Sequence, residues 1–322
     1  MKEALLIRFG GLGDLLVALP SIRLIRGKCP RARLTLACRG EYGSLLRETG
    51  VVDEIIPEDS RWLTPLFSEA PEEQIKSSAR LRSFERILGW THSCQGGLVE
   101  RCPASNDGPR KVLFIRADPR ESGQLSRYFF KKTAEALGES RSFSIADWTR
   151  LPTSRLQRPA TLNPMAGADG KKRPAVVHPG SGSESKHWPL QNFLRITGRL
   201  GECGVAGFLV TGEAEGKMAA EIEKAILPPN WIWVRRPSLS SLASLLSDSA
   251  LYLGNDSGVT HLAAACGADV VALFRRDLVA AWEPLGQVQL HVAASLSAVS
   301  AEAVWKTVAL RLPNFSAVRQ NC

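Results

Sequence analysis

Three short polar stretches of this sequence combine residue types that could do chemistry. The most distinctive is Asn255-Asp256-Ser257-Gly258, which lies between an apolar run and a small-residue helix that carries His261. Such a turn offers unpaired backbone N–H groups and the positive end of a helix dipole, which suit a phosphate or an oxyanion. Either Asp256 or Ser257 could instead cap the helix, but a cap needs only one such residue. The surplus of polar groups favours a ligand site.

A second candidate is the glycine-rich turn that ends in Asp14. The segment Gly10-Gly11-Leu12-Gly13 precedes this carboxylate, and the third glycine of the dinucleotide-binding fingerprint is absent. Because a carboxylate would repel a pyrophosphate, Asp14 suits a different task, such as accepting a proton from a substrate hydroxyl. Taken alone, the turn favours a helix cap worth about 1 kcal/mol. Its combination with the other two stretches favours the catalytic role.

The third stretch, residues 181–189, places several hydroxyls and Lys186 just before a helix. Hydroxyls, exposed N–H groups and a lysine at this position predict a phosphate cradle. A solvated lysine is the alternative, and the neighbouring His187-Trp188-Pro189 favours a fixed one. Farther along, Glu213 and Glu215 follow a strand, where a carboxylate can bind a ribose hydroxyl or lie in the first turn of a helix.

The elements that would position these stretches alternate between strand and helix, which predicts doubly wound parallel sheets of the α/β class. Residues 80–88 fit a helix or the approach to a strand, and residues 89–110 are predicted to be loop. Strands are expected at 4–8, 33–38, 51–56, 111–116, 175–180, 206–210, 231–234, 250–254 and 268–274, and helices at 15–28, 41–49, 124–137, 190–200, 239–247 and 301–312.

The domain organisation follows from a change in composition. Residues 150–174 contain four prolines, several glycines and a basic run, which is typical of a linker. We therefore expect an amino-terminal domain over 1–160, a linker over 161–174 and a carboxyl-terminal domain over 175–322. The last helix is free to pack back on the amino-terminal domain. If two doubly wound domains oppose each other, the turns at Asp14, Lys186 and Asp256 would face one cleft.

Composition narrows the class of protein. The chain has 322 residues, and Lys and Arg exceed Asp and Glu by 41 to 32, which gives a net charge of +9. This excess favours an anionic substrate or an acidic membrane surface, and the absence of a nucleic-acid motif argues against DNA or RNA. The seven cysteines form no CxxC pair, so no zinc site or disulfide framework is predicted. Without a signal-peptide pattern or an apolar run of about 20 residues, a cytoplasmic location is expected.

The three stretches together resemble glycosyltransferase family 9. The resemblance rests on Phe9-Gly10-Gly11-Leu12-Gly13-Asp14, on His178-Pro179-Gly180-Ser181 with Lys186-His187-Trp188-Pro189, and on the segment from Asn255 to Ala265. It extends over most of the chain and is strongest over 175–274. It implies a GT-B fold, in which two Rossmann-like doubly wound domains face each other across a cleft. The best-known members of the family are ADP-heptose:lipopolysaccharide heptosyltransferases.

The resemblance also implies an activity and a set of roles. The expected reaction is metal-independent, inverting transfer of a sugar, heptose from ADP-heptose, to a lipopolysaccharide core or a related cell-surface glycan. The acceptor would be an anionic, lipid-linked glycan at the inner face of the cytoplasmic membrane, and no cofactor or metal is expected. Asp14 would be the base and Lys186 would compensate phosphate charge. The other implied site residues are Gly11 and Gly13 on the acceptor side and Ser181, Gly182, Glu213, Glu215, Asp256, Ser257, Gly258 and His261 on the donor side.

Two departures from the family pattern leave substrate identity open. Arg275-Arg276 follows Phe274, where the family usually has glycine and a small hydroxyl residue, and residues 57–110 show no family pattern. They also motivate a second hypothesis, a nucleotide-sugar-binding scaffold without catalysis. The presence of Asp14, Lys186 and Asp256 together argues against it. A Rossmann oxidoreductase is a third hypothesis, and the incomplete glycine fingerprint argues against that one.

Overall fold

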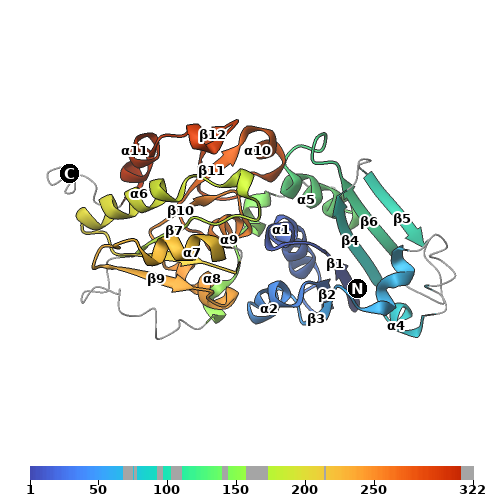
Figure 1. Cartoon of the computed structure of the whole chain (residues 1–322). Helices are drawn as coiled ribbons and strands as arrows, with labels where there is room; N and C mark the ends of the chain where they lie inside the picture. Colours follow the sequence, from blue (N-terminus) through green and yellow to red (C-terminus); the bar gives the residue numbers. More distant parts are fainter. Residues whose placement is uncertain are drawn as a thin grey trace. The chain divides into compact units, whose positions relative to one another are not determined.

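The computed structural model describes residues 1–67, 75, 78–92, 97–102, 111–139, 144–156, 173–213 and 215–312. The chain divides into two compact units (Figure 1). Unit 1 comprises Met1–Ser154 with Ala280–Trp282, and unit 2 comprises Arg155–Val279 with Glu283–Cys322. Of the predicted linker over 161–174, residues 161–172 lie outside the described residues. In the described part of the chain, no helix is long and apolar enough to cross a membrane.

Unit 1 is built on a six-stranded sheet in the order β3-β2-β1-β4-β6-β5. Its pairings are parallel except that β5 runs antiparallel to β6. The strands are β1 Glu3–Ile7, β2 Arg33–Cys38, β3 Glu54–Pro57, β4 Arg86–His92, β5 Gly97–Cys102 and β6 Lys111–Ala117. The helices are α1 Leu12–Lys28, α2 Gly40–Glu48, α4 Ala79–Arg82 and α5 Leu125–Ala136, with 3-10 turns η1 Arg61–Phe67, η2 Ile145–Trp148 and η3 Thr153–Arg155.

Both faces of this sheet are covered. Leu5 and Ile7 of β1 point to one face, where they share a buried cluster with residues of η1 and α4. On the other face, α1 and α5 pack side by side, and the Trp90 Nε1–H of β4 donates to Thr133 Oγ1 of α5 at 3.0 Å (Figure 1). Strands buried on both faces explain the nearly continuous apolar runs of the sequence.

Unit 2 has a second six-stranded sheet, β12-β11-β10-β7-β8-β9, in which every pairing is parallel. Its strands are β7 Ala175–His178, β8 Gly207–Thr211, β9 Trp231–Arg235, β10 Leu251–Asn255, β11 Val270–Arg275 and β12 Val288–Ala293. The remaining helices are α6 Leu190–Glu202, α7 Gly216–Glu223, α8 Leu239–Ser247, α9 Gly258–Cys266, α10 Arg276–Trp282 and α11 Ala301–Arg311, with 3-10 turns η5 Glu184–Lys186 and η6 Leu296–Ala298.

The core of unit 2 lies between its sheet and two helices. Val177 and Leu253 of the central strands share one buried cluster with residues of α6 and α11, including Val304 and Trp305. On the other face, the Tyr252 hydroxyl lies 3.0 Å from Thr260 Oγ1 of α9. The buried residues of the last helix therefore belong to the core of unit 2. That this helix also packs back on the amino-terminal domain stays a prediction.

Apart from the antiparallel β5, each sheet has one point at which the order of its parallel strands reverses. In unit 1 this point lies between β1 and β4, and in unit 2 it lies between β7 and β10. Open α/β sheets bind ligands outside the carboxyl ends of the strands at such switch points. The turn that carries Asp14 follows β1, and the turns that carry Lys186 and Asp256 follow β7 and β10. All three predicted stretches thus lie at switch points.

The doubly wound α/β prediction is confirmed in both units, but several elements differ from expectation. Strand β4 continues to His92, through residues that were expected to be loop, and β5 and β12 were not predicted. The sequence did not predict the whole of β4 because the glycine at position 89 interrupts its apolar pattern. A Cβ there would approach the Phe114 ring to 2.4 Å, so the close packing of β4 on β6 requires glycine.

Candidate active site

The first candidate site surrounds Asp14 in unit 1. Helix α1 begins at Leu12 with Gly11 as its N-cap, so Gly13 and Asp14 lie in the first helical turn and not in the loop before it. The Asp14 Oδ2 accepts a hydrogen bond from the Gly11 N–H at 2.9 Å. Asp14 is therefore not the N-cap that the alternative interpretation expected: it is the third residue of the helix, and one of its oxygens bonds back to the N-cap amide.

A buried arginine binds the other oxygen. Arg8, the residue directly after β1, is 3% exposed and donates from Nη2 to Asp14 Oδ1 at 2.8 Å. The same guanidinium donates from Nε to the Asp14 carbonyl at 2.9 Å and from Nη1 to the Trp90 carbonyl of β4 at 3.1 Å. Arg8 thus connects the two strands of the switch point and orients the carboxylate.

The third contact of the carboxylate is His92, the last residue of β4. Its Nε2 lies 3.0 Å from Asp14 Oδ1 and 2.5 Å from Arg8 Nη2. The side chains of Asp14 and His92 are 26% and 28% exposed. The unit 1 site is therefore a carboxylate held by a buried guanidinium and open to solvent beside an imidazole.

The charge state of this group follows from its contacts. Burial raises the pKa of Asp14. The hydrogen bond from His92, the Arg8 guanidinium and the Gly11 N–H together outweigh burial, so the pKa lies below its ordinary value. Burial lowers the pKa of Arg8 to about 10, although Asp14 opposes this effect. Both groups are charged at neutral pH, and Asp14 can accept a proton.

Sequence reasoning did not assign a role to Arg8, His92 or Glu58. The last two come from residues 57–110, which showed no family pattern, and Glu58 Oε2 accepts the Gly10 N–H at 3.3 Å. The only local signal for Arg8 is a charged residue at the end of an apolar strand. His92 is 78 residues from Asp14 in the chain, and no local pattern connects the two.

The second candidate site lies at the switch point of unit 2. Lys186, at the end of η5, places its Nζ 2.8 Å from Asp256 Oδ2, and the Asp256 side chain is 5% exposed. The Ser181 hydroxyl donates to the Asp256 carbonyl at 2.7 Å. The turns after β7 and β10 therefore meet in a paired cation and carboxylate.

Asn255 fixes these two turns to each other. Its Oδ1 accepts from the Trp188 N–H at 3.1 Å, and its Nδ2 donates to the Pro179 carbonyl at 2.7 Å. The residue is completely buried, so both bonds are shielded from water. The sequence placed Asn255 in the motif but gave it no task, and its structural role is to hold the cradle in shape.

The helix after β10 shows which residue is the cap. Ser257 Oγ accepts the Thr260 N–H at 3.3 Å, so Ser257 is the N-cap of α9 and Asp256 is not. Gly258 begins the helix, and His261 is buried in its first turn. Because Ser257 caps the helix, the Asp256 carboxylate remains for the ion pair.

The two glutamates after β8 differ in accessibility. Glu213 is exposed, whereas Glu215 is buried and its Oε2 accepts the Gly212 N–H at 2.6 Å. A Cβ on Gly180 would lie 1.9 Å from Glu215 Oε1, so the glycine leaves the space that this carboxylate fills. Burial lowers the pKa of His178, whose Nε2 is 4.0 Å from Glu215 Oε1, while the carboxylate opposes that effect.

Gly182 lies in the same turn as Gly180 and is exposed, and no described atom would lie within 4 Å of a Cβ at this position.

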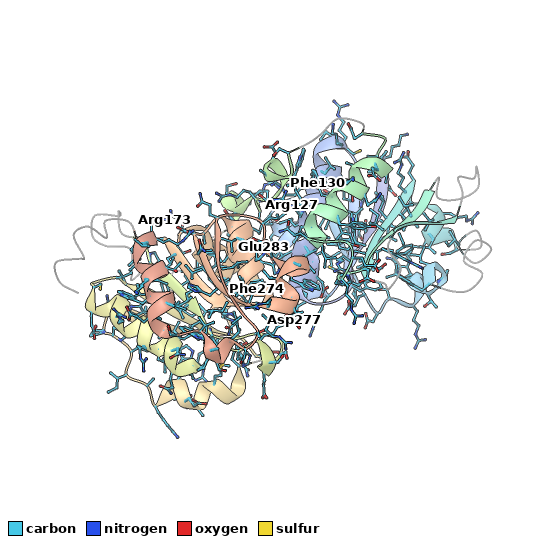
Figure 2. The ribbon with its side chains drawn as sticks, turned by 90° about the horizontal axis from the view of Figure 1, so that it is seen from above. Arg127, Phe130, Arg173, Phe274, Asp277 and Glu283 are labelled. Atoms are coloured by element: carbon cyan, nitrogen blue, oxygen red, sulfur yellow. The ribbon has the colours of Figure 1, made fainter. Side chains whose placement is uncertain are left out.

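The structure also describes Arg275 and Arg276, the residues after Phe274 that depart from the family pattern. Figure 2 labels Phe274, on β11, and Asp277, at the start of α10. Arg275 donates to both carboxylate oxygens of Asp277, from Nε at 3.0 Å and from Nη2 at 2.7 Å. This bond lowers the pKa of Asp277, with a contribution from Lys186.

Comparison with known proteins decides the family. The model of glycosyltransferase family 9 (heptosyltransferase) matches residues 131–305, which include the turns after β7, β8 and β10. The chain belongs to glycosyltransferase family 9. It is accordingly a glycosyltransferase, as the resemblance of its motifs implied. Asp14 lies before the matched residues. None of the curated proteins compared with the chain matches it by sequence.

Solved structures support the GT-B fold of this family 9 member. An E. coli heptosyltransferase WaaC with ADP is 16% identical, with a TM-score of 0.67 over 96% of this chain and 100% of that chain. A family 9 glycosyltransferase from Veillonella parvula DSM 2008 is 15% identical, with a TM-score of 0.71 over 96% and 97%. E. coli ADP-heptose lps heptosyltransferase II is 17% identical, with a TM-score of 0.67 over 97% and 98%.

Proposed function

We propose that this family 9 glycosyltransferase transfers heptose from ADP-heptose to an anionic, lipid-linked glycan, such as a lipopolysaccharide core, with inversion and without a metal ion. The observation that carries the proposal is the Lys186–Asp256 pair at the switch point of unit 2. It offers a cation for a diphosphate and a carboxylate for sugar hydroxyls. The similar structure of WaaC was solved with ADP and with ADP-2-deoxy-2-fluoro heptose, which supports the same donor here.

The proposed roles divide between the units. Unit 2 is the donor-binding domain, where Lys186 compensates the charge on the departing diphosphate and Ser181, Gly182, Ser257, Gly258 and His261 surround the donor. Of the two glutamates, Glu213 is the accessible candidate for the ribose, because Glu215 is buried against Gly180. Unit 1 is the acceptor-binding domain, with Gly11 and Gly13 in the turn beside Asp14. The net charge of +9 supports an anionic acceptor at the inner face of the cytoplasmic membrane.

The proposed mechanism follows from the two sites. Asp14 is ionised and partly exposed, so it can remove the proton from the acceptor hydroxyl. The freed oxygen attacks the anomeric carbon opposite the diphosphate, whose bond breaks, and the configuration inverts. The negative charge that develops on the diphosphate is met by Lys186 and by the N–H groups at the start of α9. The chain itself supplies the cation that this step needs.

The first test is thermal stability with a panel of nucleotides and nucleotide sugars, with and without Mg²⁺. A ligand at 100 times its Kd stabilises the folded state by about 2.7 kcal/mol, which is visible as a rise in Tm. We expect ADP and ADP-heptose to raise the Tm without Mg²⁺. A rise with UDP or GDP compounds alone would keep the chemistry and change the donor. No rise with any of them would contradict donor binding.

A matched pair of lysine variants locates this binding. Lys186→Met should lose most of the rise in Tm with ADP, and Lys186→Arg should keep part of it. Lys132→Met removes another ion-paired lysine, 2.8 Å from Glu135 in unit 1, and should keep the full rise. Equal responses of Lys186→Met and Lys132→Met would overturn the phosphate role of Lys186.

A transfer assay tests Asp14. Asp14→Ala should lower the rate of heptose transfer from ADP-heptose to a core-truncated lipopolysaccharide by about 10²- to 10⁴-fold, the usual contribution of a general base. Its rise in Tm with ADP should remain. Asp53→Ala removes another carboxylate of unit 1, paired with Arg26, and should leave transfer unchanged. A normal rate of transfer by Asp14→Ala would contradict the proposed role of Asp14 as the base.

A further inference from the structure

The contacts of His92 Nε2 make opposite demands on its proton. Arg8 Nη2 lies 2.5 Å away, and a guanidinium nitrogen can only donate, so this contact requires a lone pair on Nε2. Asp14 Oδ1 lies 3.0 Å away and can only accept when it is ionised, so that contact requires a hydrogen on Nε2. One proton, present or absent on Nε2, decides which contact is a hydrogen bond.

The contacts of the Asp14 carboxylate favour the transfer of a proton from Asp14 to His92. Oδ2 accepts the Gly11 N–H, and Oδ1 is shared by Arg8 and His92. Unperturbed imidazole holds a proton more tightly than unperturbed carboxylate, by more than about two pH units. A proton that reaches Asp14 therefore has a better acceptor within hydrogen-bond distance.

The surroundings of His92 combine two charged groups with the aromatic rings of Phe129 and, at 5.3 Å, Trp282. The charged groups in contact with it are Arg8, directly after β1, and Asp14 from α1, and α5 contributes the uncharged Phe129 ring at 6.0 Å. The side chain is 28% exposed, which gives the ring access to water. The Arg8 guanidinium opposes a positive charge on the ring and the Asp14 carboxylate favours it.

We propose that His92 is a positioning residue that acts through Asp14 by accepting its proton. This inference rests on the proposed role of Asp14 as base. The O–H bond of the acceptor breaks and its electron pair forms the bond to the anomeric carbon, while the bond to the diphosphate breaks with its pair on the diphosphate oxygen. The proton moves to Asp14 and then across the contact to His92 Nε2, and the resulting imidazolium loses a proton to water. Asp14 returns to its ionised form for the next turnover.

A measurement without substrate tests the proton position. In full-length protein labelled with ¹⁵N-histidine, the His92 signals are assigned by their loss in His92→Gln. We expect Nε2 to be averaged between protonated and unprotonated forms in the wild type. It should shift to the unprotonated form in Asp14→Ala, where only Arg8 remains, and to the protonated form in Arg8→Met. If Arg8→Met fails to fold, an identical Nε2 signal in the wild type and Asp14→Ala still overturns the proposal.

Kinetics separate the proposal from the function on which it rests. His92→Gln should lower kcat for transfer from ADP-heptose to core-truncated lipopolysaccharide by about tenfold or more, with KM unchanged, and should move the acid limb of the wild-type pH profile to lower pH, where Asp14 itself is protonated. His291→Gln, a half-buried histidine bonded to Thr307, is the control and should change neither. If Asp14→Ala is inactive and His92→Gln matches the wild type at every pH, only this inference fails. If Asp14→Ala is active, the proposed role of Asp14 fails as well.

Discussion

At the scale of single residues, a buried guanidinium organises the unit 1 site. Arg8 donates from Nε, Nη1 and Nη2 to three acceptors on two elements, and two of those acceptors belong to Asp14. Burying a charge is costly unless its hydrogen bonds are satisfied, and here all three nitrogens are used. The position of the candidate base is therefore determined by its partners as much as by its own helix.

The low pKa of Asp14 gives a pH-dependent stability. A carboxyl whose pKa is lower in the folded state than in the unfolded chain stabilises the fold above its unfolded pKa. That contribution is lost as the pH falls from about 3.9, the unfolded value, through the lower folded one. We expect Asp14→Asn to reduce the free energy of unfolding at pH 7 and to reduce it much less at pH 3. Urea unfolding at pH 7 and pH 3 measures the free energy of unfolding, and Asp59→Asn, at an exposed carboxylate, is the control. If Asp14→Asn lost the same free energy of unfolding at both pH values, the prediction would be contradicted.

The sequence predicted the location of its three polar stretches better than the residues that hold them in place. Asp14, Lys186 and Asp256 stand in compact motifs, and the structure places them at switch points. Arg8 and His92 were missed because their pairing spans 84 residues of chain, which periodicity and spacing cannot detect. The Lys186–Asp256 pair was missed for the same reason, because each residue was assigned its own task before their contact was known.

At the scale of elements, the turn after β7 depends on the absence of one side chain. Gly180→Ala would bring a Cβ to 1.9 Å from Glu215 Oε1, whereas a Cβ on Gly182, two residues later, would have no described atom within 4 Å. We expect Gly180→Ala to lower the free energy of unfolding by about 1–3 kcal/mol, as overpacking does, and to weaken the rise in Tm with ADP. Gly182→Ala should leave the free energy of unfolding unchanged. Chemical unfolding and thermal shift measure both, and equal effects of the two alanines would disprove this reason for the glycine.

The turn before α1 depends on an unusual backbone angle. Gly10 has a φ of +112°, and a Cβ there would lie 2.7 Å from Asp14 Oδ2. Gly10→Ala should therefore lower the free energy of unfolding by about 1–3 kcal/mol and also reduce sugar transfer, because it displaces the carboxylate. Gly123, with a φ of +65° and open space around it, is the matched control. Its alanine variant should lose stability through backbone strain alone and keep full transfer.

Elements with a strong apolar period were predicted closely. The helix expected at 239–247 is α8, with the same bounds, and the strand expected at 231–234 is one residue shorter than β9. The errors fall where packing overrides local pattern, as at Gly89 in β4. The short edge strand β12 was missed because its partly exposed residues give no continuous apolar run.

At the scale of the whole molecule, the proposed function assigns separate tasks to two sheets of similar topology. Each has its own core and its own switch point. ADP at saturating concentration should slow amide hydrogen exchange at the carboxyl ends of β7, β8 and β10 in unit 2. The turn around Asp14 in unit 1 should keep its exchange rate, and Lys186→Met should lose the protection. Protection of the Asp14 turn in place of the unit 2 turns would reverse the proposed assignment of donor and acceptor.

The Lys186–Asp256 ion pair has a consequence for selectivity. In the empty protein, the ammonium group already has an internal counterion, so any incoming anion must compete with it. Under the proposed function, a complete nucleotide sugar replaces both interactions at once, since its diphosphate pairs with Lys186 and its hydroxyls bind Asp256. Inorganic phosphate or the spent nucleotide satisfies the lysine and leaves the carboxylate without a partner. Under the proposed function, the pair therefore favours the complete nucleotide sugar over the spent nucleotide.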